Sequence, residues 1–250
     1  EVMEKACANG VELLVFPEMT LTGFTMRPWL HGESGDADNI PDSVSFFMEN
    51  SKKYKMPMAF GYIHTVMADG SRVYDEMKEK AYENRLVLVD GENVLLDYAK
   101  IHPFSYSGED KVYRAGEKLV QAQVKDIRIG GYICYDLRFP VWSRNVDNEY
   151  DLLIYVANWP EARKKVWKTL LQARAMENMA YVCGVNRVGI DGKGFVYRGD
   201  SMIFSPKGKK LADAGKREEV TRTCTLTRAD LEDLRGKFPA WKDADAFEIK

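Results

Sequence analysis

The sequence predicts an α/β fold in which helices cover the faces of one or two sheets. Hydrophobic residues make up 45% of the 250 residues, which is enough apolar surface to fill a core. Segments with helical and strand periodicity alternate along the chain, as in layered α/β domains. About ten strand candidates exceed the usual five or six strands of one sheet, so two sheets are plausible.

The first half of the chain contains two helix candidates and several strand candidates. The pair Asn9-Gly10 commonly terminates a helix, and Pro17 stops the apolar run before it. Hydrophobic residues recur at helical spacing over residues 43–54. The elements expected here are a helix at 2–8, a strand at 12–16, a loop at 31–41, a helix at 43–54 and strands at 58–66, 85–89 and 93–100.

The second half continues the alternation. An unbroken apolar run at 151–157 predicts a buried strand, and Trp167, Leu170 and Leu171 recur at helical spacing. The elements expected here are strands at 127–134 and 151–157, a helix at 164–179, strands at 181–188, 199–204 and 221–226, a helix at 229–238 and a polar tail at 239–250.

Charge and hydropathy exclude two classes of partner. Lys and Arg number 36 against 38 Asp and Glu, and a dedicated nucleic-acid binder normally has a basic excess. No apolar run approaches the ~18 residues that a membrane-spanning helix needs. Neither nucleic acid nor a membrane is therefore expected as a partner.

The four cysteines lie far apart and form no C-x-x-C pair; they are Cys7, Cys134, Cys183 and Cys224. Neither these cysteines nor the three histidines have the spacing of a zinc site. Reduced thiols in a cytoplasmic protein are the default interpretation, with no metal expected.

Three apolar strands each end in a reactive residue. Glu18 follows the strand at 12–16, Lys100 follows the strand at 93–99, and Cys134 ends the strand that begins at 127. Ligand sites in layered α/β folds form beyond the carboxyl ends of strands. We therefore expect three neighbouring strands to bring a carboxylate, an amine and a thiol to one rim.

This trio of side chains suits covalent hydrolysis of an amide or nitrile. Cys134 would be the nucleophile, Glu18 the base that takes its proton, and Lys100 with the backbone N–H of Tyr135 the stabilisers of the oxyanion. The alternatives are structural: a cysteine packed as a small hydrophobe, a capping Glu18 and a solvated Lys100. His102 is a further alternative as the partner of the thiol.

The residues around the trio resemble a known family. The segments LVFPEM at 14–19, YAKIHPF at 98–104 and GYICYDLRFP at 131–140, in this order, resemble the nitrilase superfamily of carbon-nitrogen hydrolases. The resemblance covers nearly the whole chain. It is nearest to the omega-amidase branch through YSGEDK at 106–111, FPVWSRN at 139–145 and KFPAWKDAD at 237–245.

The resemblance implies a fold and an activity. The fold is a four-layer α-β-β-α sandwich formed by a single domain over residues 1–250, usually paired into a homodimer or higher homo-oligomer. The activity is release of ammonia from the terminal amide of short α-keto acid amides, such as 2-oxoglutaramate and 2-oxosuccinamate, without a metal or organic cofactor. Other amidases, carbamoylases or nitrilases of the superfamily are the alternative, and a non-catalytic binding protein on the same fold is a third.

The resemblance also assigns roles residue by residue. It implies Glu18 as general base, Lys100 as oxyanion stabiliser and Cys134 as nucleophile. Glu109 matches the family's second glutamate, which orients Lys100 and the substrate amide. A carboxylate at Glu109 would also keep Lys100 charged in a poorly solvated pocket. The alternative is an exposed loop acid.

The substrate-binding residues follow from the chemistry of the substrate. A short substrate with a free carboxylate needs a cation, and a guanidinium binds a carboxylate bidentately, so Arg138 is the expected anchor. A salt bridge to Asp136 or another surface acid is the alternative. Asn158 and Trp159 are expected to line the pocket. Glu177 is expected to be a buried structural acid paired with Arg174 or Arg187.

The chain opens with Glu1-Val2-Met3, in the middle of the first expected helix. The resemblance implies that a strand and half a helix, about 25 residues at typical element lengths, precede this point. A targeting signal is therefore left undecided.

Overall fold

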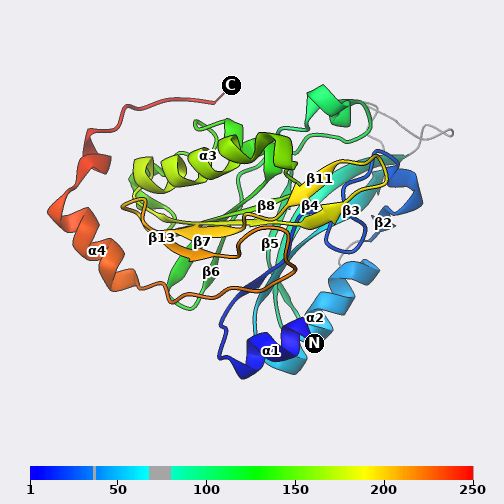
Figure 1. Ribbon diagram of the computed structural model, residues 1–250, viewed down its shortest axis with the longest axis horizontal. Helices are drawn as coiled ribbons and strands as arrows, with labels where there is room; N and C mark the ends of the chain where they lie inside the picture. Colours follow the sequence, from blue (N-terminus) through cyan, green and yellow to red (C-terminus); the bar gives the residue numbers. More distant parts are fainter. Residues whose placement is uncertain (36–37, 68–79, 250) are drawn as a thin grey trace. The chain divides into compact units, whose positions relative to one another are not determined.

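The chain divides into two compact units, Glu1–Val120 and Gln121–Lys250, each built on its own sheet. The computed structural model describes residues 1–35, 38–67 and 80–249 (Figure 1). The prediction of two main sheets is confirmed. That the whole chain acts as a single domain stays a prediction.

The sheet of the first unit brings several strand ends to the same edge. Its strands, in spatial order, are β1 (Leu14–Val15), β3 (Met58–Met67), β4 (Lys80–Asp90) and β5 (Asn93–Ala99), with β2 (Glu33–Ser34) also paired to β3. β1 runs parallel to β3, whereas β4 is antiparallel to both β3 and β5. The carboxyl ends of β1, β3 and β5 therefore share one edge.

Two helices cover this sheet, α1 (Val2–Ala8) and α2 (Asp42–Tyr54), and they lie side by side in Figure 1. Val44 and Phe47 of α2 belong to one hydrophobic cluster with Phe60 and Val87 of the sheet. The rings of Phe47 and Phe60 stack with centroids 3.9 Å apart. Burial of this apolar face, more than helix propensity, fixes α2 on the sheet.

The sheet of the second unit has six strands. Their spatial order is β13 (Lys210–Asp213), β12 (Met202–Phe204), β9 (Tyr181–Asn186), β8 (Leu152–Ala157), β7 (Ile127–Ile133) and β6 (Gln121–Val124). The three central strands β7, β8 and β9 are parallel, and every residue of β8 is buried, as its apolar run predicts. A separate two-stranded ribbon joins β10 (Val188–Ile190) and β11 (Val196–Arg198).

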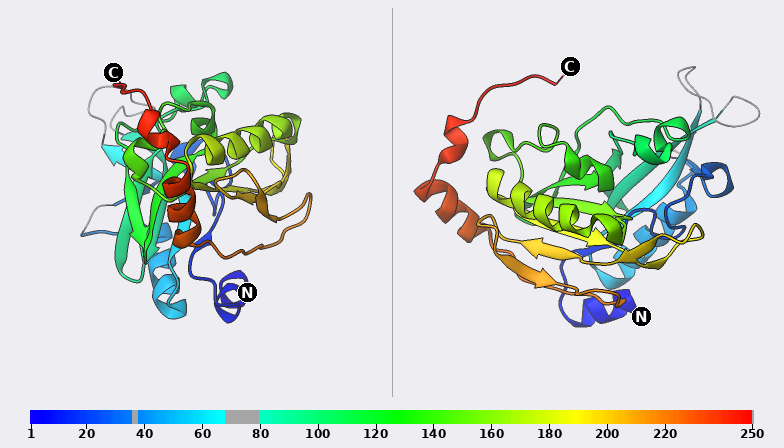
Figure 2. Two further views of the ribbon diagram at one scale, coloured as in Figure 1. Left: turned by 90° about the vertical axis from the view of Figure 1, so that its left-hand side faces the viewer. Right: turned by 45° about the horizontal axis from the view of Figure 1, so that its top comes forward.

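Helix α3 (Lys164–Glu177) lies along one face of this sheet (Figure 2). A Cβ at Gly184 of β9 would lie 2.4 Å from a methyl group of Leu171 and 2.8 Å from the ring of Trp167, so only glycine permits this close approach. Helix α4 (Arg228–Lys237) is tied to the sheet by Arg235, whose Nη1 donates to Asp151 at 2.7 Å.

Short 3₁₀ helices carry most of the connections: η1 (Pro28–Leu30), η2 (Ser105–Ser107), η3 (Glu109–Lys111), η4 (Cys134–Arg138), η5 (Val146–Asn148), η6 (Glu161–Arg163) and η7 (Ala240–Asp243). The expected helices are confirmed with shifts of one or two residues at their ends.

The strand expected at 221–226 is wrong. These residues lie outside every helix and strand, and most of their side chains are exposed. β-Branched threonines favour a strand only where a partner strand and a face to cover exist. The loop expected at 31–41 contains the short strand β2, and its residues 36 and 37 lie outside the described residues.

Candidate active site

Glu18 stands on a turn that is fastened to β3. The amide of Phe16 donates to the carbonyl of Ala59, and the amide of Thr20 donates to the carbonyl of Gly61, both at 2.8 Å. A Cβ at Gly61 would lie 2.5 Å from the nitrogen of Met19 and 2.9 Å from the Cα of Glu18. Only glycine lets the turn lie this close, and the turn leaves Glu18 2% exposed.

Glu18, Lys100 and Glu109 meet in a buried cluster within the first unit. The Nζ of Lys100 lies 3.1 Å from Oε1 of Glu18, and 3.0 and 2.8 Å from the two carboxylate oxygens of Glu109. Lys100 is 1% exposed and Glu109 is fully buried. The interpretation of Glu109 as an exposed loop acid is therefore wrong, because Phe104 and Lys100 enclose its carboxylate with donors.

Asn84 of β4 is a fourth member of this cluster. Its Nδ2 donates to Oε1 of Glu18 at 2.7 Å and to Oε1 of Glu109 at 3.1 Å. Asn84 is not among the site residues expected from the sequence, since the strand expected there begins one residue later, at Arg85. The available signal is weak: an asparagine in a long strand goes against β-propensity, and such local conflicts concentrate at functional positions.

The electrostatics of the cluster are set by one cation among two acids. Burial raises the pKa of Glu109, the charge of Glu18 raises it further, and Lys100 opposes both. The amide of Phe104 also donates to Glu109, at 2.5 Å. Burial similarly raises the pKa of Tyr113, whose hydroxyl donates to the carbonyl of Thr25 at 2.8 Å. The phenol of Tyr113 is therefore a neutral group next to the two acids of the cluster.

Cys134 begins a tight turn directly after β7 in the second unit. Its φ is +47°, a left-handed conformation that a residue with a Cβ adopts only under constraint. Asp136 supplies that constraint, because its Oδ2 accepts the amide of Ile133 at 3.0 Å. Cys134 is half-buried, and its Sγ lies 4.0 Å from the carbonyl of Asn158. The strand therefore ends at Ile133, one residue earlier than expected.

The expected substrate-binding residues follow the ends of β7 and β8. The guanidinium of Arg138 lies 5.4 Å from the ring centre of Trp159, which is 4% exposed. Asn186 fixes Trp159, accepting its amide at 2.8 Å and donating to its carbonyl at 3.0 Å. Arg138 itself is exposed, and Asn158 is buried. Tyr135 packs its ring edge-on against Phe139.

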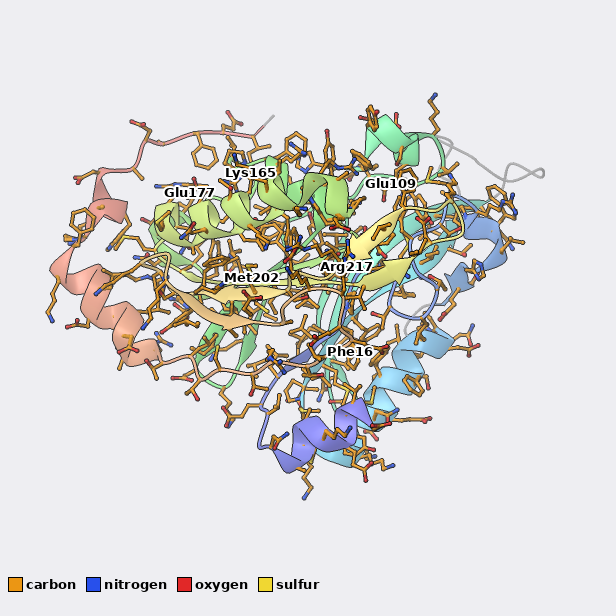
Figure 3. The ribbon with its side chains drawn as sticks, viewed as in Figure 1. Phe16, Glu109, Lys165, Glu177, Met202 and Arg217 are labelled. Carbon is orange, nitrogen blue, oxygen red and sulfur yellow. The ribbon has the colours of Figure 1, made fainter. Side chains whose placement is uncertain are left out.

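Glu177 has the expected partner but not the expected burial. Its carboxylate lies 2.8 Å from Nη1 of Arg174, and its side chain is 36% exposed. Figure 3 shows Glu177 at one end of α3, of which it is the last residue. The buried member of the pair is Arg174, which also donates to the carbonyl of Leu137 at 2.7 Å. The prediction of a buried acid is wrong because Met176 and Glu177, the last two residues of α3, are exposed, whereas Arg174 and Ala175 of the same turn are buried.

The expectation that three neighbouring strands carry the trio is also wrong. β3 and β4 separate β1 from β5, and β7 belongs to the sheet of the other unit. Glu18 reaches Lys100 because its turn folds back over β3 at Gly61. Glu18, Lys100 and Glu109 thus come together in the first unit, and the second unit carries Cys134, Tyr135, Arg138, Asn158 and Trp159.

Among residues 1–35, 38–67 and 80–249, no group of three or more His, Cys, Asp or Glu side chains could hold a metal ion. Within the same ranges, no helix has the length and apolar character to cross a bilayer.

The sequence matches one protein family over nearly its whole length. The sequence model described as "Carbon-nitrogen hydrolase" matches residues 1–236. The chain belongs to the carbon-nitrogen hydrolase family. The family assignment made from the three sequence segments is therefore confirmed.

Curated relatives place this hydrolase near two named amidases. It is 39% identical to "Omega-amidase YafV" of Escherichia coli (strain K12) over 241 residues, which cover 96% of this chain and 87% of that protein. It is 28% identical to "2-oxoglutaramate amidase" of Bacillus subtilis (strain 168), covering 94% of this chain and 86% of that protein.

Solved structures share the fold. XC1258 of Xanthomonas campestris, described as a CN-hydrolase superfamily protein with an arsenic adduct in its active site, is 32% identical with a TM-score of 0.83, covering 96% of this chain and 86% of that one. Nit3 of Saccharomyces cerevisiae, at 19% identity and a TM-score of 0.77, covers 95% and 88% and supports the fold alone. The chain has the α/β fold of the nitrilase superfamily, as its sequence predicts.

Proposed function

We propose that this hydrolase releases ammonia from the terminal amide of short α-keto acid amides, with 2-oxoglutaramate and 2-oxosuccinamate as the substrates. The observation that carries the proposal is the buried cluster in which one ammonium, Lys100, is held between two carboxylates, Glu18 and Glu109. The similarity to an omega-amidase and to a 2-oxoglutaramate amidase supports the choice of substrate.

The first half of the reaction forms a thioester. Glu18 takes the proton of the Cys134 thiol, and the thiolate attacks the amide carbon. Negative charge develops on the amide oxygen, where the ammonium of Lys100 and the backbone N–H of Tyr135 stabilise it. The C–N bond then breaks, Glu18 returns its proton to the leaving nitrogen, and ammonia departs.

The second half hydrolyses the thioester. Glu18 removes a proton from a water molecule, and the resulting hydroxide attacks the thioester carbon. The oxyanion is stabilised by the same two donors, the C–S bond breaks, and the proton returns to the sulfur of Cys134. Glu109 keeps Lys100 charged and oriented throughout. Without a carboxylate partner, burial of the Lys100 amine would favour its neutral form.

Arg138 is proposed to bind the free carboxylate of the substrate. Its guanidinium is exposed and lies over the ring of Trp159. The buried ring supports the guanidinium on one side, and the other side stays open to solvent. Asn158 and Trp159 are proposed to line the pocket beside it. A second carboxylate on the substrate would then distinguish α-keto acid amides from simple amides.

A substrate panel tests the proposal. Ammonia release is measured for 2-oxoglutaramate, 2-oxosuccinamate, glutamine, a carbamoyl amino acid and a simple nitrile. We expect the highest kcat/KM for the two keto-acid amides, and a faster reaction with any other member would overturn the substrate assignment.

Arg138→Ala should raise KM for the keto-acid amides about tenfold or more and leave KM for neutral amides unchanged. An equal rise for neutral amides would remove the carboxylate-anchor role.

The compartment and assembly belong to the same proposal. We propose that the hydrolase acts in the cytoplasm as a homodimer or higher homo-oligomer. Its four cysteines are widely spaced in the sequence and form no C-x-x-C pair, which suits a reducing compartment. Sedimentation of the purified protein across a range of concentrations tests the assembly, and a monomer at every concentration would contradict it.

A further inference from the structure

We infer that Asn84 is a positioning residue of the proposed active site, holding the carboxylates of Glu18 and Glu109 in one fixed arrangement around Lys100. The inference rests on the proposed function, because it assigns Asn84 to the same cluster. It adds a fourth residue whose part is to orient the two acids rather than to touch the reacting atoms.

Asn84 and Lys100 bind the same two oxygen atoms. Nδ2 of Asn84 lies 2.7 Å from Oε1 of Glu18 and 3.1 Å from Oε1 of Glu109. Nζ of Lys100 lies 3.1 and 3.0 Å from these same atoms. Two nitrogens and two oxygens thus form a closed ring of contacts. A displacement of either carboxylate breaks a contact to both donors.

The charge balance explains why an amide is suited to this position. With Lys100 protonated and both acids ionised, the buried cluster carries one excess negative charge, so it needs donors as well as charge. An amide NH₂ supplies one N–H to each acid and adds no charge of its own. A second cation would neutralise the acids, and a hydroxyl would have a single proton to donate.

The backbone of Asn84 places the side chain. Asn84 lies opposite Ile63 of β3, and its carbonyl accepts the amide of Lys100 at 2.9 Å. The side chain is 1% exposed. Its Oδ1 has no hydrogen-bond partner within the described part of the chain, which costs stability. Packing alone would favour a leucine of similar size, so the amide is better explained by its two donated bonds.

The charged and titratable neighbours of Asn84 can be named within the described part of the chain. The titratable groups facing Asn84 are Glu18, Lys100 and Glu109, with the buried phenol of Tyr113 next to the acids. Successive residues of a strand point to opposite faces, so Glu83 of β4 lies on the other face. There it pairs with Arg85 and Arg114.

Asn84→Leu is the main test, because it keeps the size of the side chain and removes both donated bonds. A carboxylate that loses a donor is harder to ionise. We expect the acid limb of the kcat/KM profile for 2-oxoglutaramate to move up by about one pH unit, since a hydrogen bond to a charged group has about that effect. Asn84→Asp adds a third acid and should move the limb further. Glu83→Gln, on the opposite face of β4, should leave the limb in place.

A second measurement does not depend on turnover. The carboxyl carbon of Glu109, identified by its loss in Glu109→Gln, is titrated by ¹³C NMR in the wild type and in Asn84→Leu. We expect its pKa to be higher in the variant. A folded Asn84→Leu protein with an unchanged Glu109 titration and an unchanged acid limb would overturn the inference. A wild-type protein that hydrolyses no member of the panel would overturn the proposed function, while the Glu109 titration would still decide the role of Asn84.

Discussion

The two units hold their candidate catalytic groups by different physical means. In the first unit, Glu18, Lys100 and Glu109 are almost completely buried and fix one another through charge and hydrogen bonds. In the second unit, Cys134 is half-buried and is held by backbone geometry, with φ at +47°. Proton transfer and charge stabilisation need a fixed, poorly solvated environment, whereas a nucleophile needs a defined direction and access to substrate.

Their buried carboxyls differ as well. Burial and the charge of Glu18 raise the pKa of Glu109, which shares Lys100 with that second acid. Burial would also raise the pKa of Asp151 in the second unit, but hydrogen bonds from Arg128 and Arg235 overcome it and lower the pKa. Glu109 shares one cation with a second acid, whereas Asp151 has two cations to itself, and this difference separates the proposed catalytic cluster from a structural ion pair.

The largest expected effect comes from the thiol. Cys134→Ala should reduce ammonia release by at least ~10³-fold, because no other group can form the thioester. Thermal unfolding should stay nearly unchanged, since one half-buried thiol is a small packing loss. Ammonia release and a melting curve on the same preparation check both parts. Unchanged ammonia release would restore the non-catalytic interpretation of the fold.

Removing the ammonium should affect both activity and stability. Lys100→Met leaves two buried carboxylates without their cation, which should cost about 3–5 kcal/mol of unfolding free energy and about 10²–10³ in kcat. Urea denaturation and ammonia release measure the two effects. The matched control is Lys52→Met, which breaks an exposed ion pair with Glu92 and should change neither. Equal losses in both variants would contradict the special role of the buried cluster.

A smaller effect is expected from the backbone beneath Glu18. Gly61→Ala places a Cβ 2.5 Å from the nitrogen of Met19, so the turn must move. We expect a loss of about 1–3 kcal/mol in stability and roughly tenfold or more in kcat, since small displacements of catalytic groups are costly. Gly236→Ala is the control, because nothing lies within 4 Å of its Cβ position in α4. It should be neutral or slightly stabilising.

The smallest effect on activity is expected from the structural acid. Asp151→Asn breaks the ion pairs with Arg128 and Arg235 and should cost about 3 kcal/mol of stability at pH 7. The pKa of Asp151 is lowered in the fold, so its contribution is present above the ordinary value of about 3.9 and is lost as pH falls through the folded value. Wild-type stability should therefore converge on that of the variant in acid. A constant difference in the free energy of unfolding between the wild type and Asp151→Asn from pH 7 to pH 2 would contradict this.

The sequence predicted the two-sheet α/β fold and the candidate catalytic residues for identifiable reasons. Glu18, Lys100 and Cys134 each follow an apolar run, so local pattern and family resemblance agree at these positions. β6 and β13 were missed, because edge strands are short and half exposed and carry polar residues such as Gln121 and Lys210. Thr221 was misread as strand because propensity does not reveal whether a partner strand exists.

Two features of the site depend on contacts between residues distant in sequence. Asn84 is 66 positions from Glu18 and 25 from Glu109, and no local pattern reports that the three side chains converge. The close approach at Gly61 is a second case, since a glycine inside a strand is compatible with a bulge, a bend or a neighbouring backbone. Only the fold distinguishes these possibilities.

The burial of Lys100 has a consequence for chemical labelling. An amine-reactive reagent modifies a lysine only where its ammonium can reach solvent and lose a proton, and Lys100 is 1% exposed in an acidic enclosure. The folded protein should therefore carry the label on surface amines such as Lys5 and Lys237 long before Lys100 reacts. The rate at which Lys100 acquires the label then measures how often the buried cluster exposes this amine to solvent.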